Sequence, residues 1–456
     1  MVKQVSLRIA SRFFGSACGM AGSSGSSLSR RQFLGSSARN AASMAAGVAA
    51  GVVPWGDEAT AGGTAGPVTV GVIGVRQQGR LIARELARLP GVQVSGLCDV
   101  DASLLPALAQ DVALQQGGQL PRMYGDFRQM LADPTLHAVA IATPDHWHAL
   151  LAAHALRAGK DVYLETPVTH TLDEGERLLA LARETGRIVQ GALVQRSGPH
   201  FQQAIDFLHQ GRLGRVHQAR AWTVHQRKSI GIGSEGPVPE GLDYDLWLGP
   251  APARPFQANR LHGNWRWFWD YGSGELGNWG VPLLDVARWG LGVGLPLQVS
   301  AAGGKFHFRD DQQTPDTLQV QYQYPQQTIL WEHRLWSQHA PEGRSSAVAF
   351  EGELGTLILD RGGWKVYGGV SAVGQPSGDL LAQHLGQFVD CVRTRGTPTA
   401  SLEESLVSSA LCHLGCLAYR LGRSVNIDLQ TGRPRNDPSA ERLLATTARA
   451  PWQWPA

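Results

Sequence analysis

The stretch VTVGVIGVRQQGRLIARELARLPGVQVSGLCD, residues 68–99, decides the fold of this chain. Residues 68–73 are rich in valine and isoleucine and indicate a buried parallel strand. A glycine-containing turn follows, and apolar residues then recur at i, i+4 and i+7 from Ile82, as in a helix. A second apolar strand, 92–98, ends on Asp99, which lies twenty residues beyond Gly79. Strand, glycine turn, helix, strand and acid in this order are typical of a dinucleotide-binding βαβ unit.

The turn reads G-x-R-x-x-G, with Arg76 where the middle glycine of the pattern is expected. Gly74 allows a tight turn, Gly79 lets the helix pack close to the strand, and the helix N-terminus offers free N–H groups to a pyrophosphate. The Arg76 guanidinium either clamps the phosphates or sits in their place. Asp99 would hydrogen-bond the adenosine ribose and repel a 2′-phosphate, which favours NAD over NADP. The alternative is a βα turn that binds no nucleotide.

The composition is typical of a globular protein of two domains, with 456 residues, 43% of them hydrophobic and 17% charged. No apolar run reaches the roughly eighteen residues that a membrane span needs. Six basic and two acidic residues fall within 1–61, so the rest of the chain is nearly neutral and gives no electrostatic reason to expect nucleic acid. Cys412 and Cys416 flank His413 at helical spacing, which favours core packing over a metal site.

Residues 1–61 are predicted to be a signal and linker outside the fold. Residues 29–34 read SRRQFL, an Ala/Gly-rich stretch follows at 41–53, and residues 59–61 form a candidate cleavage site. This order is similar to a twin-arginine export signal. We therefore expect a periplasmic or otherwise exported protein with no stable membrane insertion after cleavage. The alternative is a basic N-terminus without that role.

Strands and helices continue to alternate after Asp99 and predict a doubly wound Rossmann domain over residues 62–193, within an α/β protein. Further strands are predicted at 123–124, 137–143, 161–165 and 187–193, which makes six in all. Ligands bind beyond the carboxyl ends of such strands. The predicted cofactor-binding residues are Gly74, Arg76, Gly79, Asp99, Thr143, Pro144, His148 and Glu165.

Residues 194–425 predict a second α/β domain with a large, mostly antiparallel open sheet, because apolar and polar residues alternate in several short segments. Strands are expected at 216–224, 318–324, 328–331, 347–350 and 356–359. Helices are expected at 201–208, 381–393 and 402–421. Residues 426–456 are expected to form an extended C-terminal tail.

Tryptophans cluster between residues 247 and 289, and aromatic faces suit the apolar side of a pyranose ring. The alternation of Trp265, Trp267 and Trp269 indicates a strand with one face in the core. Candidate substrate contacts are Gln195 and Arg196, which follow the last Rossmann strand, together with His262, Trp267, Trp269 and Asp270; Asn264 and Arg266 lie in the same segment. The alternative is that the tryptophans only pack a loop-rich region.

Several stretches resemble the Gfo/Idh/MocA family, the relatives of glucose–fructose oxidoreductase and inositol dehydrogenase, and specifically its exported branch. The matching stretches are ATPDHWHALLAAHALRAGKDVYLETP, QRSGPHF, EGLDYDLWLGPAPARPF, NWRWFWDYGSGELGNWG, DVARWGLG, HLGQFVDCVRTR and LCHLGCLAYRLGR. The resemblance implies a Rossmann domain followed by an α/β domain, and activity on sugars or cyclitols with NAD(P). It also implies a small-molecule substrate and a homo-oligomer.

The chain departs from that family where the resemblance would place the acid–base groups. The family has Glu-Lys-Pro after the fifth strand and Asp-x-Gly-x-His-x-x-Asp later. Here Thr166 replaces the lysine, Asn278 the first acid and Pro282 the histidine, while Asp285 is kept. Threonine and proline are not general bases at neutral pH. The candidate catalytic positions are Thr166, Asn278, Asp285 and His148; His262, Asp270 and Glu275 are further titratable groups in reach, and His148 alternatively only fixes the rim loop.

Three hypotheses follow from this sequence. The first is an exported NAD-linked oxidoreductase that acts on a secondary alcohol of a sugar, cyclitol or sugar derivative, with a rearranged acid–base set. The second is a redox-neutral glycosidase or lyase that uses retained NAD through a 3-keto sugar. The third is a catalytically silent homologue that binds a sugar or a nucleotide. The fold alone does not separate them.

Overall fold

The computed structural model describes residues 66–376, 378–444 and 448–455. The expected twin-arginine signal at 1–61 lies outside these residues, so it stays a prediction. None of the helices in the described part of the chain has the length and apolar character that crossing a bilayer requires.

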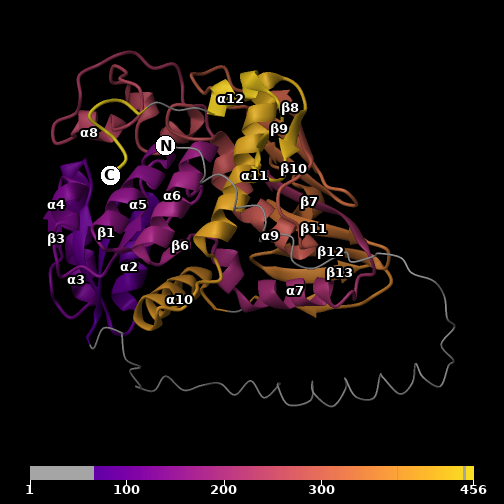
Figure 1. The fold of residues 1–456 in the computed structure, drawn as a ribbon, viewed down its shortest axis with the longest axis horizontal. Helices are drawn as coiled ribbons and strands as arrows, with labels where there is room; N and C mark the ends of the chain where they lie inside the picture. The colour runs from indigo at the N-terminus through magenta and orange to yellow at the C-terminus, as the bar shows by residue number, and fades with distance from the viewer. Residues whose placement is uncertain (1–65, 377, 445–447, 456) are drawn as a thin grey trace, which may run out of the picture. The chain divides into compact units, whose positions relative to one another are not determined.

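The first half of the described chain forms a six-stranded parallel sheet in the order β3-β2-β1-β4-β5-β6 (Figure 1). Its strands are β1 (Val68–Ile73), β2 (Val92–Cys98), β3 (Arg122–Tyr124), β4 (Ala138–Ile141), β5 (Asp161–Leu164) and β6 (Val189–Gly191). The helices between them are α2 (Gln77–Arg88), α3 (Leu105–Gln115), α4 (Phe127–Leu131), α5 (Asp145–Arg157) and α6 (Leu172–Thr185). The predicted doubly wound Rossmann sheet is therefore confirmed.

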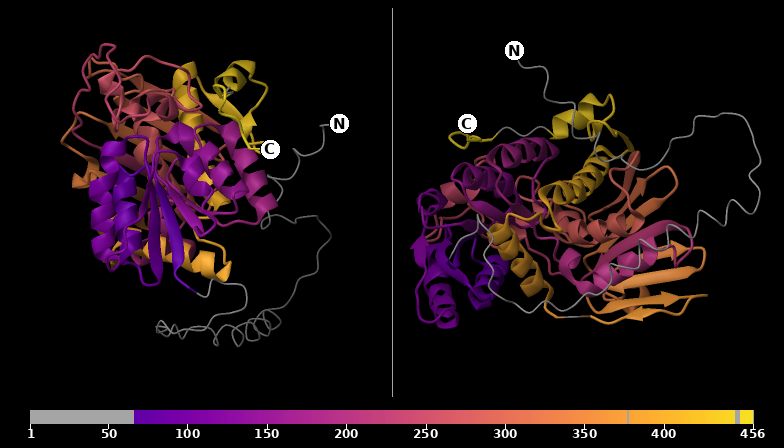
Figure 2. Two further views of the ribbon diagram at one scale, coloured as in Figure 1. Left: turned by 90° about the vertical axis from the view of Figure 1, so that its left-hand side faces the viewer. Right: turned by 60° about the horizontal axis from the view of Figure 1, so that its bottom comes forward.

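A late helix completes the core of this sheet. Helix α10 (Leu380–Thr394) returns to pack beside α2 (Figures 1 and 2), and Leu385, Phe388 and Val389 join the buried cluster of β1 and α2. Asp379 caps the helix by accepting from the backbone N–H groups of residues 381 and 382. The sequence predicts this helix but not that it packs against the Rossmann half of the protein.

The second sheet has ten strands in the order β14-β13-β12-β11-β7-β10-β9-β8-β15-β16. They are β7 (Val216–Val224), β8 (Gln298–Gly304), β9 (Thr317–Gln323), β10 (Thr328–Arg334), β11 (Ser346–Gly352), β12 (Gly355–Asp360), β13 (Gly363–Tyr367), β14 (Val373–Gly374), β15 (Val425–Asp428) and β16 (Arg433–Pro434). All pair antiparallel except β7 with β10. The prediction of a mostly antiparallel sheet is confirmed.

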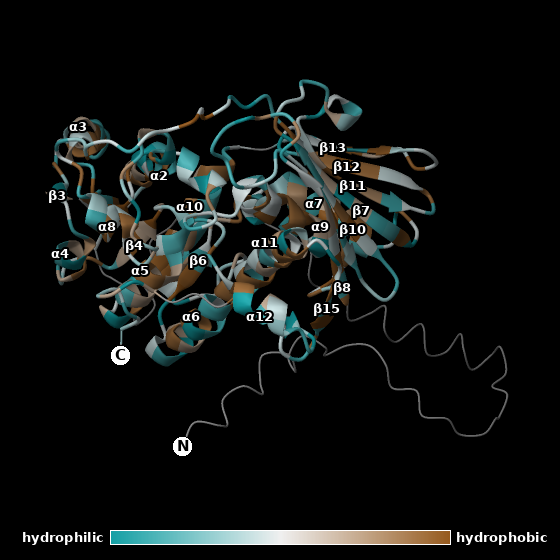
Figure 3. Cartoon of the chain, turned by 90° about the horizontal axis from the view of Figure 1, so that it is seen from above, coloured by the Kyte–Doolittle hydropathy of each residue, from teal (hydrophilic) through white to brown (hydrophobic). Residues whose placement is uncertain are grey.

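One face of this sheet carries three helices, α7 (Pro199–His209), α9 (Val281–Leu291) and α11 (Leu402–Leu421), as Figure 3 shows. Along β9, Leu318, Val320 and Tyr322 are buried on the face that the helices cover. The glutamines between them are exposed, so the other face is polar there. Cys412 and Cys416 lie in the core on α11, as their spacing predicts.

Two local predictions are wrong. The strand predicted from the alternating tryptophans is not formed. Trp265 and Trp267 belong to a short 3-10 helix, η5 (Asn264–Trp267), so the turns of this helix and not strand pairing determine their spacing. Residues 426–456 are not an extended tail: β15 pairs with β8, α12 (Pro438–Leu444) follows, and Trp452 packs against Trp147 at a ring distance of 5.0 Å. Apolar residues in this segment gain burial that an extended tail would not give.

Candidate functional site

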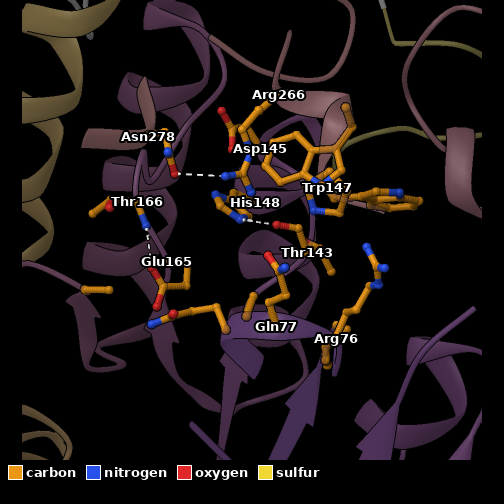
Figure 4. Close-up of a pocket in the computed structure, with 18 of the residues that line it drawn as sticks. Arg76, Gln77, Thr143, Asp145, Trp147, His148, Glu165, Thr166, Arg266 and Asn278 are labelled. Atoms are coloured by element: carbon orange, nitrogen blue, oxygen red, sulfur yellow. Dashed lines mark hydrogen bonds between the residues drawn. The ribbon is translucent and has the colours of Figure 1, made fainter. Parts of the chain in front are cut away.

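A cavity of about 430 Å³ lies beyond the carboxyl ends of the Rossmann strands (Figure 4). The turns after β1, β2, β4 and β5 form one wall. The other wall comes from η5, from the π-helix η6 (Leu276–Gly280) and from the turn between β12 and β13. The cavity thus joins the sheet edge where α/β folds bind ligands to loops of the second sheet.

The glycine turn is shaped as a phosphate cradle. Gly74 has a φ of +83°, and a Cβ there would lie 2.8 Å from the backbone of Ala142. A Cβ on Gly79 would lie 1.8 Å from the carbonyl oxygen of Gly74, so only glycine lets α2 approach the strand this closely. Gln77 and Gln78, in the first turn of α2, line the cavity, and no side chain caps this helix. Its free N–H groups fit an anionic ligand such as a pyrophosphate.

Asp99 and Arg76 sit at one end of this cradle. The carboxylate of Asp99 accepts from the backbone N–H groups of Val75 at 2.8 Å and Asp101 at 3.0 Å. Arg76 extends to the second domain and donates to the carbonyl oxygen of His262, whose ring lies 3.0 Å from Asp101. Arg76 therefore ties the glycine turn to the loop across the cavity. The residues present fit a dinucleotide, since glycine turn, helix start and Asp99 all face one cavity.

His148 has no ring nitrogen free for proton transfer. Its Nδ1 lies 2.7 Å from the carbonyl oxygen of Pro167 and its Nε2 lies 2.8 Å from that of Thr143 (Figure 4). Burial lowers the pKa of His148, so the ring is neutral and donates to one of these two oxygens. Thr143, Pro144 and His148 all line the cavity. The contacts of His148 match the alternative in which it fixes the rim loop, and they do not suit a general base.

Glu165 presents the clearest ionisable group on the cofactor rim. Its Oε2 accepts from the backbone N–H of Thr166 at 3.2 Å, and its Oε1 is buried without a hydrogen-bond partner among the described residues. Burial raises the pKa of Glu165 to about 7, although a hydrogen bond from Gln78 and the charge of Arg361 oppose the shift. Both Glu165 and Thr166 line the cavity. A carboxyl group that titrates near neutral pH is suited to acid–base work.

The opposite wall is polar. Asn278 accepts from Arg266 at 3.3 Å and donates to Glu275 at 3.1 Å. Arg227 and His225 also contact Glu275, at 2.9 and 3.0 Å. Burial alone would raise the pKa of Glu275, but these hydrogen bonds and the charge of Arg227 lower it to about 2. Glu275 therefore stays ionised and holds Asn278 and Arg227 in place.

Asp285 and Arg196 are not in the cavity, which corrects two sequence predictions. Arg196 donates to both carboxylate oxygens of Asp285 at 2.8 and 2.9 Å, and Ser408 donates to Asp285 at 2.6 Å. The two charged side chains are 8% and 1% exposed. The pair joins α9 to the segment after β6, Ser408 joins it to α11, and neither charged group is available to a ligand.

Three more predicted substrate contacts lie elsewhere. Trp267 is buried in a separate apolar cluster, and the guanidinium of Arg420 lies over the ring of Trp269. Asp270 pairs with Arg254 at 2.8 Å. Gln195 and His262, in contrast, line the cavity. Gly79 shapes the turn without lining the cavity.

Several lining residues were not singled out from the sequence: Asp145, Trp147, Arg227 and Arg361; Trp265 and Trp279, of the predicted tryptophan cluster, also line the cavity. Asp145 and Trp147 lie in the quoted TPDHWH stretch, which was the available signal. Arg361 comes from a hairpin turn with no motif around it, so nothing in the sequence pointed to it.

The sheet order and the rim geometry define an α/β dehydrogenase fold, and comparison with known proteins gives the family. Residues 68–193 match the model described as the oxidoreductase family NAD-binding Rossmann fold. Residues 221–348 and 370–454 match that of the oxidoreductase family C-terminal alpha/beta domain. The chain belongs to the Gfo/Idh/MocA oxidoreductase family and contains its NAD-binding Rossmann domain.

Curated relatives are distant. The uncharacterized oxidoreductase YrbE of Bacillus subtilis is 28% identical over 39% of this chain and 47% of its own length, so the match spans about half of that relative. An uncharacterized oxidoreductase of Synechocystis is 26% identical over 74% of this chain and 89% of its own length. A glycosyl hydrolase family 109 protein of Streptomyces niveus is 26% identical over 54% of this chain and 47% of its own length.

Solved structures share the fold at low identity. The aldose-aldose oxidoreductase of Caulobacter crescentus, complexed with glycerol, has a TM-score of 0.62 and 19% identity, covering 79% of this chain and 100% of its own. The WlbA dehydrogenase of Bordetella pertussis, in complex with NADH and UDP-GlcNAcA, has a TM-score of 0.61 and 18% identity, covering 79% and 99%.

Proposed function

We propose that this protein is an NAD-dependent oxidoreductase that oxidises or reduces a secondary alcohol of a sugar, cyclitol or sugar derivative. The observation that carries the proposal is the shared cavity: the glycine turn of the Rossmann sheet and the polar wall of η5 and η6 face the same space. Buried polar atoms without partners, on Thr143, Gln195 and Arg266 among the described residues, face ligand-sized volume there. Relatives in complex with NADH and a sugar nucleotide support this choice.

Asp99 supports NAD over NADP. Its carboxylate is held at the end of β2 by two backbone N–H groups, beside the start of α2. A fixed negative charge at this position favours the ribose hydroxyls of NAD and repels the extra phosphate of NADP.

The proton chemistry falls to Glu165 in this proposal. When bound, NAD would supply the acceptor for the hydride. Thr166 and Pro282 have no group that accepts a proton near neutral pH, and both ring nitrogens of His148 face carbonyl oxygens. The free Oε1 of Glu165 would take the proton of the substrate hydroxyl, while Asn278 and Arg266 would orient the sugar from the opposite wall.

The test is to purify the full chain, identify any nucleotide released on denaturation, and follow NADH formation with a panel of sugars and cyclitols. NAD binding with NADH formation on at least one of them is expected. A protein that takes up no NAD(H) would overturn the proposal.

A second candidate is a redox-neutral glycosidase that uses retained NAD, because several relatives are named glycosyl hydrolase family 109 proteins. Cleavage of a glycoside without net NADH would favour this candidate over the first. Binding of nucleotide or sugar without turnover would instead favour a silent homologue.

We further propose export through the twin-arginine route and assembly as a homo-oligomer. The paired arginines Arg30 and Arg31 in SRRQFL support export. An Arg30→Lys, Arg31→Lys variant is expected to stay in the cytoplasm upon cell fractionation, and light scattering of the purified chain would test the assembly.

A further inference from the structure

Arginines in the interior of this protein are paired with carboxylates. Arg196 contacts Asp285 and Glu404, and Arg288 contacts the same two acids. On the cavity wall, Arg227 pairs with Glu275. Such pairing is expected, because a guanidinium taken out of water without a partner is costly.

Arg266, whose side chain is partly buried, and Arg361, which is an exposed side chain on the cavity wall, lack such a partner in the described part of the chain. Within the described ranges, neither has a carboxylate oxygen within 4.0 Å. Arg266 makes one side-chain hydrogen bond, to Asn278 at 3.3 Å, and its buried Nε has no partner. Arg361 makes no side-chain hydrogen bond to any described residue, and its Cζ lies 5.3 Å from the ring of Trp279. Both line the cavity.

Aromatic rings hold both guanidinium groups. The Cζ of Arg266 lies 5.1 Å from the ring of Trp265, and that of Arg361 lies 5.3 Å from the ring of Trp279. A guanidinium over an indole keeps its planar edge available for two parallel N–H···O bonds. This edge matches a carboxylate.

Of the acids near these arginines, Glu275 is ionised and acts on Arg266 through its charge, but it is already paired with Arg227 and His225. The other two acids are mostly or partly protonated. Burial raises the pKa of Asp145 to about 8 despite the charge of Arg266, and that of Glu165 to about 7 despite the charge of Arg361. At neutral pH, Asp145 is therefore mostly protonated and Glu165 only partly ionised. The wall keeps an excess of positive charge.

We propose that the substrate is an acidic sugar, such as a uronic or aldonic acid, whose carboxylate is bound by Arg266 and Arg361. This inference rests on the proposed function and names the substrate class of that same cavity. Figure 4 shows Arg266 and Asn278 across the cavity from Arg76 and Gln77, which belong to the phosphate cradle. Arg266 is thus placed for the substrate and not for the phosphates of a dinucleotide, and Arg361 lines the same cavity close enough for its charge to act on Glu165.

The experiment is calorimetric titration of the full chain with D-glucuronate, D-glucose and D-glucose 6-phosphate, each with and without NAD. The variants are Arg361→Gln and Arg266→Gln, and the matched control is Arg254→Gln, whose side chain pairs with Asp270 outside the cavity lining. Glucuronate is expected to bind about 10- to 100-fold more tightly than glucose, the range that charge-assisted hydrogen bonds supply.

The Arg361→Gln variant is expected to remove most of that preference while its NAD affinity and melting temperature stay those of the control variant. Equal binding of glucose and glucuronate, or tighter binding of the 6-phosphate, would overturn the acidic-sugar assignment. Equal weakening of NAD and glucuronate by Arg361→Gln would also overturn it, since Arg361 would then serve the cofactor. Glucuronate binding without any NAD binding would keep this site and overturn the proposed function instead.

Discussion

The two walls of the cavity are built in opposite ways. On the Rossmann wall, polar groups are satisfied by nearby backbone: Asp99 by two N–H groups, and His148 by its position between two carbonyl oxygens. On the second wall, Arg266 and Arg361 come from segments far apart in the chain and lack carboxylate partners among the described residues. Among the described residues, the first wall leaves the N–H groups at the start of α2 and the Oε1 of Glu165 for a ligand but no unpaired guanidinium beyond the turn, whereas the second wall leaves two guanidinium groups without a carboxylate partner.

This difference indicates which of the two walls determines substrate specificity. A wall held by its own backbone keeps the same geometry for a common cofactor. A wall with unpaired guanidinium groups selects a ligand by charge, because an anion accepts charge-assisted hydrogen bonds from them. Glu165 lies where the walls meet, which makes it the most informative position to change.

The largest effect is expected for Glu165→Gln. Loss of a positioned acid–base group should lower kcat by about 10²–10⁴-fold. In the parent protein, kcat/KM for alcohol oxidation should rise as pH increases through about 7, because the carboxyl group must lose its proton before it accepts another. This rise of kcat/KM with pH should be absent in the Glu165→Gln variant, and a pH profile of the initial rate measures it. If the variant keeps this pH dependence, the general base is a residue other than Glu165.

Asp285→Asn tests whether the buried pair belongs to the fold and not to the site. Removing one charge leaves Arg196 under-compensated in the interior and should lower the free energy of unfolding by about 3–5 kcal/mol. Urea denaturation at neutral pH measures it, with Glu403→Gln of the exposed Arg183–Glu403 pair as the control.

The Arg196–Asp285 pair should also make the free energy of unfolding depend on pH. Although burial opposes it, Arg196 lowers the pKa of Asp285, so the pair stabilises the protein above the unfolded value of about 4. The stability difference between parent and Asp285→Asn should shrink as pH falls below that value. A sugar KM that rises strongly in the folded variant would contradict a purely structural role.

Arg76→Gly separates the two roles that the sequence left open. The structure has Arg76 donating to the carbonyl of His262, across the cavity from its own turn. If this tie only closes the loop, its loss should speed NAD association and dissociation alike, by up to about tenfold, or ~1.4 kcal/mol. Stopped-flow fluorescence gives both rates. A weaker Kd with unchanged association would show instead that Arg76 clamps the phosphates.

The sequence predicts the Rossmann wall well, because local spacing determines it. The turn from Gly74 to Gly79, the acid at the end of β2 and the helix starts all follow from short-range periodicity and backbone chemistry. The same reasoning identifies α11 at residues 402–421 without error.

The second wall depends on contacts that no local pattern encodes. Arg196 meets Asp285 across 89 residues of chain, and Arg361 reaches the cavity from a hairpin turn. The alternating tryptophans predict a strand, but the chain forms a 3-10 turn there, and Trp265 and Trp267 pack against one apolar cluster instead of opposite faces of a sheet. Motif spacing therefore predicts Asp285 in the site. In the structure Asp285 forms a buried ion pair with Arg196 and does not line the cavity.

The smallest effect is expected for Asp270→Asn, a predicted substrate contact that lies outside the cavity lining. Asp270 pairs with Arg254, which is 50% exposed, so solvent screens the interaction and its loss should cost at most about 1 kcal/mol. Thermal denaturation should show a small shift that high salt removes, and the KM for the sugar should not change. A several-fold rise in KM would mean that the second wall extends beyond Arg266 and Arg361, and that part of its selectivity comes from carboxylates instead of arginines.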